Sequence, residues 1–365
     1  KAYKIWKNIG YDFLFDDAEK LNITTEHIYK TYISEFFKHG GMEVKQLEKQ
    51  IEIAYDEKKF YSSPVDYGIV VYNLTKLKPE MLTKNINEAD ILLGSASYDL
   101  SCSCGSGTSE APKRLRELSS YLPCYDANFH LLSDIKIYDY CDVSPKNGIA
   151  SFYQELEEKA KEMLKLDKFV LFFGGDHSIS VPHEKAFYEK YHNLDKHPVI
   201  IHIDAHMDIL DEYMGSNMSH ACPNRRALDN GYQVGDINMV GIRSYEDGEV
   251  KFYHEHPELN VITADMFREL GYQKVVEKIK NRYDSNAVFY LSFDIDAIDP
   301  SYAPGTGTPE TFGLTPLQMR EFLTLAFKEL DIKAMDLVEI SPKLDCNDIT
   351  SWLGLKLIYE IIYQK

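Results

Sequence analysis

Short apolar segments alternate with helix-like stretches through most of the chain, and this alternation restricts the fold more than any other feature. Eight such segments are rich in Val, Ile and Phe, and they span residues 89–96, 135–143, 168–173, 198–203, 237–242, 260–264, 287–293 and 334–340. Amphipathic stretches such as 151–166 and 315–330 separate most of them. This pattern is typical of a mostly parallel sheet with helices on both faces. We therefore expect a three-layer α-β-α domain around a central eight-stranded sheet.

The first part of the chain has a different character. Residues 1–86 are rich in Lys, Glu and Tyr, contain helix-like stretches such as 42–60, and carry no chemical motif. We expect a mostly helical N-terminal extension over residues 1–86, followed by one catalytic domain over residues 87–365. The extension would serve assembly or cover the edge of a site.

Charge and composition exclude several classes of function. The 365 residues include 40 basic and 58 acidic ones, which gives a formal charge of −18 and argues against nucleic acid or an anionic membrane as the partner. No apolar run is long enough to span a bilayer, and the first residues have no apolar signal core. The six cysteines form no CxxC pair, so free thiols in a reducing cytoplasm are expected.

Polar clusters follow four of the predicted strands, at the points where the strands end. These clusters are "GGDHS" (174–178), "DAHMD" (204–208), "DIDAIDP" (294–300) and "EISP" (339–342). Ligands of parallel sheets bind beyond the carboxyl ends of the strands, so we expect all four clusters at one edge of the sheet.

The spacing within the clusters predicts which side chains converge. Side chains alternate along a strand, so Asp204, His206 and Asp208 share a face if the extended conformation continues. Asp294 and Asp296 share a face for the same reason. The two glycines before His177 permit an abrupt turn there. The remaining acids have local roles: Asp176 is expected to cap a helix or orient its neighbour, and Asp299 to form a turn.

Only a multivalent cation makes such a set of acids physically sensible. The metal charge offsets the repulsion between carboxylates and favours the deprotonated ligands. Six ligands are too many for a closed tetrahedral zinc site, and mostly oxygen ligands with imidazole suit Mn²⁺. Bridging carboxylates would hold two ions with an activated water between them. The predicted ligands are His177, Asp204, His206, Asp208, Asp294 and Asp296.

The motifs resemble those of the ureohydrolase superfamily, which includes arginases and agmatinases, and they are most similar to the agmatinase branch. The resemblance rests on "GGDHS", "DAHMD" and "SFDIDAIDPSYAPGTGTP", and it runs from about residue 89 to the end of the chain. "GSGTSEAPKRLRELS" (105–119) is similar to a further pattern of the family, with Ala111 in place of its second Gly.

This resemblance implies a role for each predicted site residue. One Mn²⁺ would be bound by His177, Asp204, Asp208 and Asp294, and the other by Asp204, His206, Asp294 and Asp296. Asp208 would also hold the attacking water and pass a proton to the leaving amine. His220 would shuttle a proton, and Glu339 would pair with the guanidinium group. The products would be urea and an amine. Relatives commonly form trimers or hexamers, so by analogy we expect a homo-oligomer.

The sequence favours agmatine as the substrate and leaves alternatives open. Arginases usually have Asn where this chain has Leu210, and an apolar side chain cannot replace that hydrogen bond. "APGTGTPETFGLT" and "HACPNRRA" resemble agmatinase-like enzymes, although Ala221 and Asn224 depart from the pattern. Guanidinobutyrate, guanidinopropionate, arginine and free guanidine stay open as substrates, with Ni²⁺ a candidate metal for guanidine.

Two other classes of function are alternatives. A metal-dependent deacetylase of the same broad fold would use one zinc and a different ligand pattern. A catalytically inactive relative would regulate by binding a partner, but such proteins usually lose ligands and all six are present here. Cys102 and Cys104 are interpreted as small loop residues rather than as a redox pair.

Overall fold

The described part of the chain is built on one parallel sheet. The computed structural model describes residues 81–122, 125, 135–145 and 148–364. All eight predicted strands are present: β1 (Ile91–Ala96), β2 (Ile137–Val143), β3 (Phe169–Phe173), β4 (His197–Ile203), β5 (Ile237–Ile242), β6 (Asn260–Thr263), β7 (Ala287–Asp294) and β8 (Ile332–Val338). Their order in the sheet is β2-β1-β3-β8-β7-β4-β5-β6, and every neighbouring pair is parallel.

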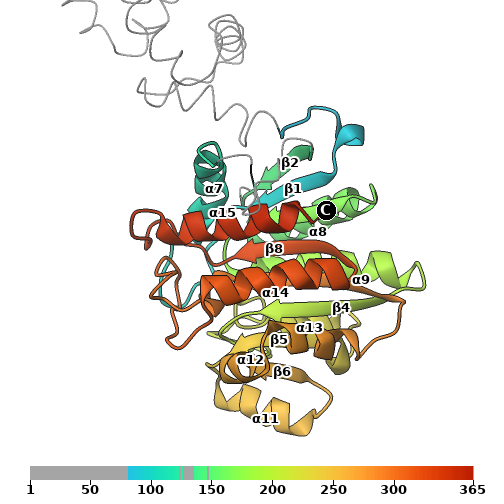
Figure 1. The fold of residues 1–365 in the computed structure, drawn as a ribbon, viewed down its shortest axis with the longest axis vertical. Coiled ribbons are helices and arrows are strands. Elements are labelled where there is room, and N and C mark those ends of the chain that lie inside the picture. Colours follow the sequence, from blue (N-terminus) through green and yellow to red (C-terminus); the bar gives the residue numbers. More distant parts are fainter. Residues whose placement is uncertain (1–80, 123–124, 126–134, 146–147, 365) are drawn as a thin grey trace, which may run out of the picture. The chain divides into compact units, whose positions relative to one another are not determined.

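Helices cover both faces of this sheet, which confirms the predicted three-layer architecture (Figure 1). One layer contains α8 (Ile149–Leu164), α9 (Ser180–His192) and α10 (Pro223–Asp229). The other contains α7 (Ala111–Ser119), α12 (Ala264–Leu270), α13 (Tyr272–Lys280), α14 (Pro316–Glu329) and α15 (Ile349–Ile362). Helix α11 (Asp247–Glu255) follows β5, near one end of the sheet (Figure 1). Short 3-10 turns are η2 (Ile86–Glu88), η3 (Thr108–Glu110), η4 (His177–Ile179), η5 (Val234–Asp236) and η6 (Ile295–Ala297).

The four central strands place the polar clusters side by side. β3, β8, β7 and β4 are consecutive in the sheet, and each of them is followed by one of the four clusters. All eight residues of β7 are buried, because the helix layers cover both of its faces. In the register, Asp294 pairs with Val338 of β8, and Phe293 pairs with Ile203 of β4. The clusters therefore meet at one edge of the sheet, as predicted.

Two sequence predictions concern parts of the chain that are only partly described. The expected N-terminal extension, residues 1–86, lies outside the described residues except for 81–86, while Glu80–Lys365 forms one compact unit. Among the cysteines whose side chains are described, Cys102, Cys104, Cys222 and Cys346 are free thiols. No helix in the described ranges has both the length and the apolar character needed to cross a membrane.

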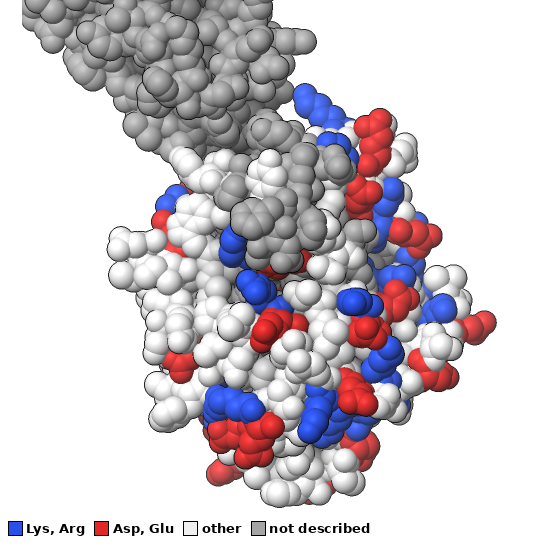
Figure 2. All heavy atoms as spheres, viewed as in Figure 1, with Lys and Arg blue, Asp and Glu red and all other residues white. Residues whose placement is uncertain are grey.

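Charged side chains of both signs are interspersed over the face shown in Figure 2. One ion pair joins α13 and α14, where Lys280 lies 2.8 Å from Glu329.

Candidate metal centre

His177 reaches the site through a sharp turn after β3. Gly174 and Gly175 form the turn, and a Cβ at Gly175 would lie 1.9 Å from the carbonyl oxygen of Tyr98. Only glycine fits at this close approach. Asp176 caps η4 by accepting a hydrogen bond from the backbone N–H of Ser178 at 3.1 Å, which confirms its predicted capping role.

Three carboxylates surround one ring nitrogen of His177. Its Nδ1 lies 3.0 Å from Asp204, 3.1 Å from Asp208 and 3.2 Å from Asp294, in each case to an Oδ2 atom. The opposite ring nitrogen, Nε2, lies 2.8 Å from the hydroxyl of Ser292. The structure therefore brings together the four residues predicted to hold one ion, with Nδ1 of His177 facing the acids.

The segment after β4 provides the next three residues by a turn rather than by a longer strand. β4 ends at Ile203, so the extended conformation on which the predicted shared face of Asp204, His206 and Asp208 depended does not continue. Asp208 has a left-handed backbone with φ of +50°. This conformation costs energy in a non-glycine residue and is typical of functional sites. The turn still directs all three side chains to the site, because Asp208 folds back toward His177.

Asp204 lies between the two histidines. Its Oδ2 faces His177, and its Oδ1 lies 3.3 Å from Nδ1 of His206. The same His206 nitrogen lies 3.1 Å from Oδ2 of Asp296. Asp294, at the end of β7, caps η6 by accepting a hydrogen bond from the N–H of Asp296 at 2.8 Å. Asp204 thus contacts both His177 and His206, as expected of a ligand shared by two metal ions.

Burial strengthens the repulsion between the carboxylates of this cluster, because little water screens their charges. The side chains of His177, Asp204, Asp294 and Asp296 are almost fully buried. Burial, Asp296 and Asp204 raise the pKa of Asp294 well above its ordinary value, and burial and Asp204 raise the pKa of Asp296. Burial alone would lower the pKa of His177, but the surrounding carboxylates raise it well above its ordinary value. Burial alone would raise the pKa of Asp204, but His202, His177 and His206 lower it well below its ordinary value. Carboxylate repulsion therefore remains uncompensated chiefly at Asp294 and Asp296.

These residues fit a pair of divalent cations. Two groups of potential ligand atoms, each within 4.8 Å of one another, share Asp204: His177, His202, Asp204 and Asp208, and Asp204, His206 and Asp296. Nδ1 of His177 and Oδ2 of Asp204 are buried and make no geometrically acceptable hydrogen bond, although they face each other. Cations would satisfy both atoms and offset the carboxylate repulsion. A donor set of imidazole nitrogens and carboxylate oxygens is suited to such ions.

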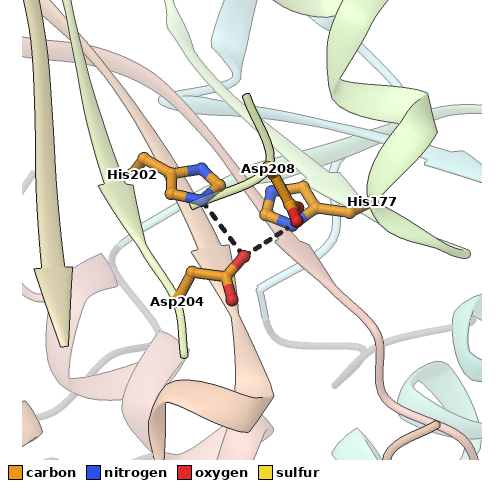
Figure 3. A group of neighbouring side chains, drawn as sticks. All are labelled: His177, His202, Asp204 and Asp208. Carbon is orange, nitrogen blue, oxygen red and sulfur yellow. Dashed lines mark ion pairs between the residues drawn. The ribbon is translucent and has the colours of Figure 1, made fainter. Parts of the chain in front are cut away.

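His202 belongs to this cluster, but the sequence reasoning missed it. Figure 3 shows the rings of His202 and His177 near the carboxylate of Asp204. Nε2 of His202 lies 3.1 Å from Oδ2 of Asp204, and the two rings stack with centroids 4.8 Å apart. The signal was available, because His202, Asp204 and His206 recur at intervals of two in "HIDAH". It was hidden because His202 lies inside an apolar strand.

Asn224 is a second supporting residue that the sequence did not identify. This side chain is buried, and its Nδ2 donates to the carbonyl of Met207 at 2.8 Å. Its backbone N–H donates to the carbonyl of Asp208 at 3.0 Å. Asn224 thus holds the turn that presents Asp208, which gives this departure from the agmatinase-like pattern a structural role.

Glu339 follows β8 directly and lies beside the cluster. Its backbone is left-handed, with φ of +61°, and its side chain is buried. Oε1 accepts a hydrogen bond from the backbone N–H of His177 at 2.8 Å. Burial and then the charge of Asp176 raise the pKa of Glu339 well above its ordinary value. No cationic side chain in the described part of the chain pairs with this buried carboxylate, which is therefore suited to receive a cationic group from a substrate.

The two remaining predicted residues lie outside the cluster. His220 is half-buried in the loop after β4, and its ring contacts Ser101 and Ser103 of the loop after β1. Asp299 accepts hydrogen bonds from the N–H groups of Ser301 and Gly313, each at 3.0 Å. Asp299 therefore forms a turn, as predicted.

The sequence of the chain matches a family model over nearly all of the compact unit Glu80–Lys365. Residues 89–363 match the model of the arginase family. The chain belongs to the arginase family. The predicted membership of the ureohydrolases is thereby confirmed, and with it the enzyme class, a hydrolase of C–N bonds in linear amidines.

Individual relatives are similar over the same part of the chain. An agmatinase of Neisseria meningitidis serogroup C (strain 053442) is 32% identical over 285 residues, which cover 76% of this chain and 87% of the relative. An agmatinase of Bacillus subtilis (strain 168) is 31% identical over 283 residues, covering 75% and 91%. The crystal structure of an agmatine ureohydrolase of Thermoplasma volcanium is similar with a TM-score of 0.70 and 28% identity, covering 79% of this chain and 94% of that one.

Proposed function

We propose that this protein hydrolyses a small guanidino compound to urea and an amine, with agmatine as the substrate. The observation that carries the proposal is the buried cluster around Asp204, with Glu339 held 2.8 Å from the N–H of the ligand His177. The similarity to two agmatinases and to an agmatine ureohydrolase supports agmatine in particular.

We propose that the six predicted residues would hold two Mn²⁺ ions, to both of which Asp204 and Asp294 would contribute. Two such cations, when bound, supply Lewis-acid activation of a water molecule. Manganese is favoured because the donors are four carboxylates and two imidazoles: His177, Asp204, His206, Asp208, Asp294 and Asp296. Ni²⁺ becomes the candidate if the substrate is guanidine.

The other side chains bind the substrate and move protons. The carboxylate of Glu339 pairs with the planar guanidinium group and fixes its carbon beside the cluster. Asp208 accepts a hydrogen bond from the attacking water and orients it. The water oxygen adds to the guanidinium carbon, and the C–N bond to the leaving nitrogen then breaks, which gives urea. The leaving nitrogen gains the two protons that the water loses: Asp208 passes one, and His220 is the proposed shuttle for the other.

The test is an assay of urea release by the Mn²⁺-loaded protein. Agmatine, arginine, guanidinobutyrate, guanidinopropionate and guanidine are compared at equal concentrations. We expect urea and putrescine from agmatine, with the highest kcat/KM of the five. If another compound gives a higher kcat/KM, that compound is the substrate instead of agmatine. If none of the five releases urea, the proposed function is contradicted.

A further inference from the structure

The loop after β1 holds His220 at both ring nitrogens. Nδ1 of His220 lies 2.6 Å from the backbone carbonyl oxygen of Ser101, and the backbone N–H of His220 donates to the Ser101 hydroxyl at 3.0 Å. A carbonyl oxygen only accepts hydrogen bonds, so Nδ1 carries the hydrogen. In the neutral ring, Nε2 therefore bears the lone pair and is the atom that gains and loses a proton.

The hydroxyl of Ser103 lies at this second nitrogen. Its Oγ is 3.3 Å from Nε2 of His220. A hydroxyl donates to a neutral imidazole nitrogen and accepts from a protonated one, so this contact serves both states of the ring. No other hydrogen-bond partner of Nε2 is present among the described residues.

The loop that carries Ser103 is itself fixed to the metal-centre side of the sheet. The N–H of Ser101 donates to Oδ2 of Asp176 at 2.9 Å, and Asp176 immediately precedes His177. Asp99 closes the loop by accepting from the N–H of Gly107 at 3.0 Å and from the hydroxyl of Ser109 at 2.9 Å. The position of Ser103 is therefore tied to the turn that presents a metal ligand.

The same loop lies near the proposed guanidinium site. Burial, and then the charge of Glu339, raises the pKa of the Cys102 thiol. Cys102 directly precedes Ser103, and Ser101 is bonded to Asp176, the neighbour of His177, whose N–H donates to Glu339. A loop held by hydrogen bonds, a defined ring tautomer and one hydroxyl at Nε2 together can direct a proton.

We propose that Ser103 is a positioning residue for proton transfer, which holds Nε2 of His220 toward the leaving amine through the hydroxyl contact. This inference rests on the proposed hydrolysis of a guanidino compound. The hydroxyl keeps the imidazole from rotating while its charge changes, and neither bonds to the substrate nor binds metal. Its loss lowers the rate of the chemical step and leaves substrate binding and metal content intact.

The test compares Ser103→Ala with Ser106→Ala in the Mn²⁺-loaded full chain. Ser106 is an exposed serine of the same loop whose hydroxyl is contacted by Lys343 at 3.4 Å, away from His220. We expect Ser103→Ala to lower kcat about tenfold, in keeping with loss of a hydrogen bond to a group that becomes charged, with KM and bound metal unchanged. Ser103→Thr, which keeps the hydroxyl, restores most of kcat, and Ser106→Ala behaves like the wild type.

A double-mutant cycle separates positioning from a general structural role. If Ser103 acts through His220, adding Ser103→Ala to His220→Ala lowers kcat no further. A further tenfold loss in the double variant, or a wild-type kcat for Ser103→Ala, would overturn the proposal. Urea release by the wild type is measured first, so failure of the proposed function is recognised separately from failure of this inference.

Discussion

Replacing Asp294 by Asn should change protein stability in opposite directions with and without metal. Asp294 is buried, and its Oδ1 caps η6 by accepting from the N–H of Asp296. The amide of Asn keeps an oxygen for this cap and has nearly the same size. The substitution therefore removes one negative charge while leaving the local fold intact.

The structure sets the size of the effect. Oδ2 of Asp204 and Oδ2 of Asp294 lie 3.0 and 3.2 Å from the same nitrogen of His177. These two oxygens are then no more than ~6 Å apart, and at an effective dielectric constant of about 20 their repulsion is about 3 kcal/mol. At shorter separations this repulsion is larger, but Asp294→Asn also removes the attraction between Asp294 and His177. We therefore expect the free energy of unfolding of the metal-free protein to rise by about 1–3 kcal/mol.

The gain should depend on pH. Burial, Asp296 and Asp204 raise the pKa of Asp294 well above its ordinary value in the folded protein. A carboxyl of this kind favours the folded state while it is protonated, so its contribution is present below its ordinary pKa and is lost as the pH rises through the folded-state pKa. The Asp294→Asn variant should therefore be as stable as the wild type at acid pH. Its free energy of unfolding should exceed that of the wild type by a growing amount as the pH rises.

Thermal unfolding of the chelated protein, followed by circular dichroism at several pH values, measures this gain. About 2–4 °C in Tm is expected for each kcal/mol in a domain of this size. Asp247→Asn, which removes an exposed charge in α11, is the control and should change stability by less than about 0.5 kcal/mol. With saturating Mn²⁺ the Asp294→Asn variant should be less stable than the wild type, because it has lost a metal ligand. A metal-free variant less stable than the wild type at every pH would refute the reasoning.

Three further predictions test other parts of the site. Glu339→Gln should lower kcat/KM about ten- to a hundredfold in steady-state kinetics, because the guanidinium loses a charged partner, and an unchanged value would remove Glu339 from that role. His220→Ala should lower kcat about 10²- to 10⁴-fold while metal content, measured by elemental analysis, stays constant. Gly175→Ala should lower the free energy of unfolding by about 1–3 kcal/mol, because the added Cβ would collide with the Tyr98 carbonyl. The control is Gly235→Ala, whose added Cβ would meet no atom closer than 4.0 Å. Thermal unfolding compares the two variants, and equal shifts in Tm would contradict this account.

The fold could be predicted because its central strands are clear in the sequence as separate apolar runs. β3, β4 and β7 are buried along almost their whole length, so each is a continuous apolar run that ends at a polar cluster. Apolar runs do not encode which strands become neighbours. The position of β8 between β3 and β7 brings Glu339 beside His177, and it depends on long-range packing that no local pattern records.

The site was predictable in its composition and less so in its geometry. The presence of Asp204, His206 and Asp208 follows from the motif, but strand periodicity gave the wrong reason for their convergence. The left-handed backbone of Asp208 replaces the extended path, and the buried Asn224 holds this turn through hydrogen bonds to the backbone. Such strained conformations depend on the surrounding structure rather than on local propensity.

Metal binding at two adjacent positions is the central claim, and anomalous diffraction at the manganese edge from Mn²⁺-loaded crystals tests it most directly. We expect two peaks about 3.5–4 Å apart, one beside Nδ1 of His177 and one beside Nδ1 of His206, with the carboxylate of Asp204 between them. A single peak, or peaks away from these two nitrogens, would contradict the dinuclear centre.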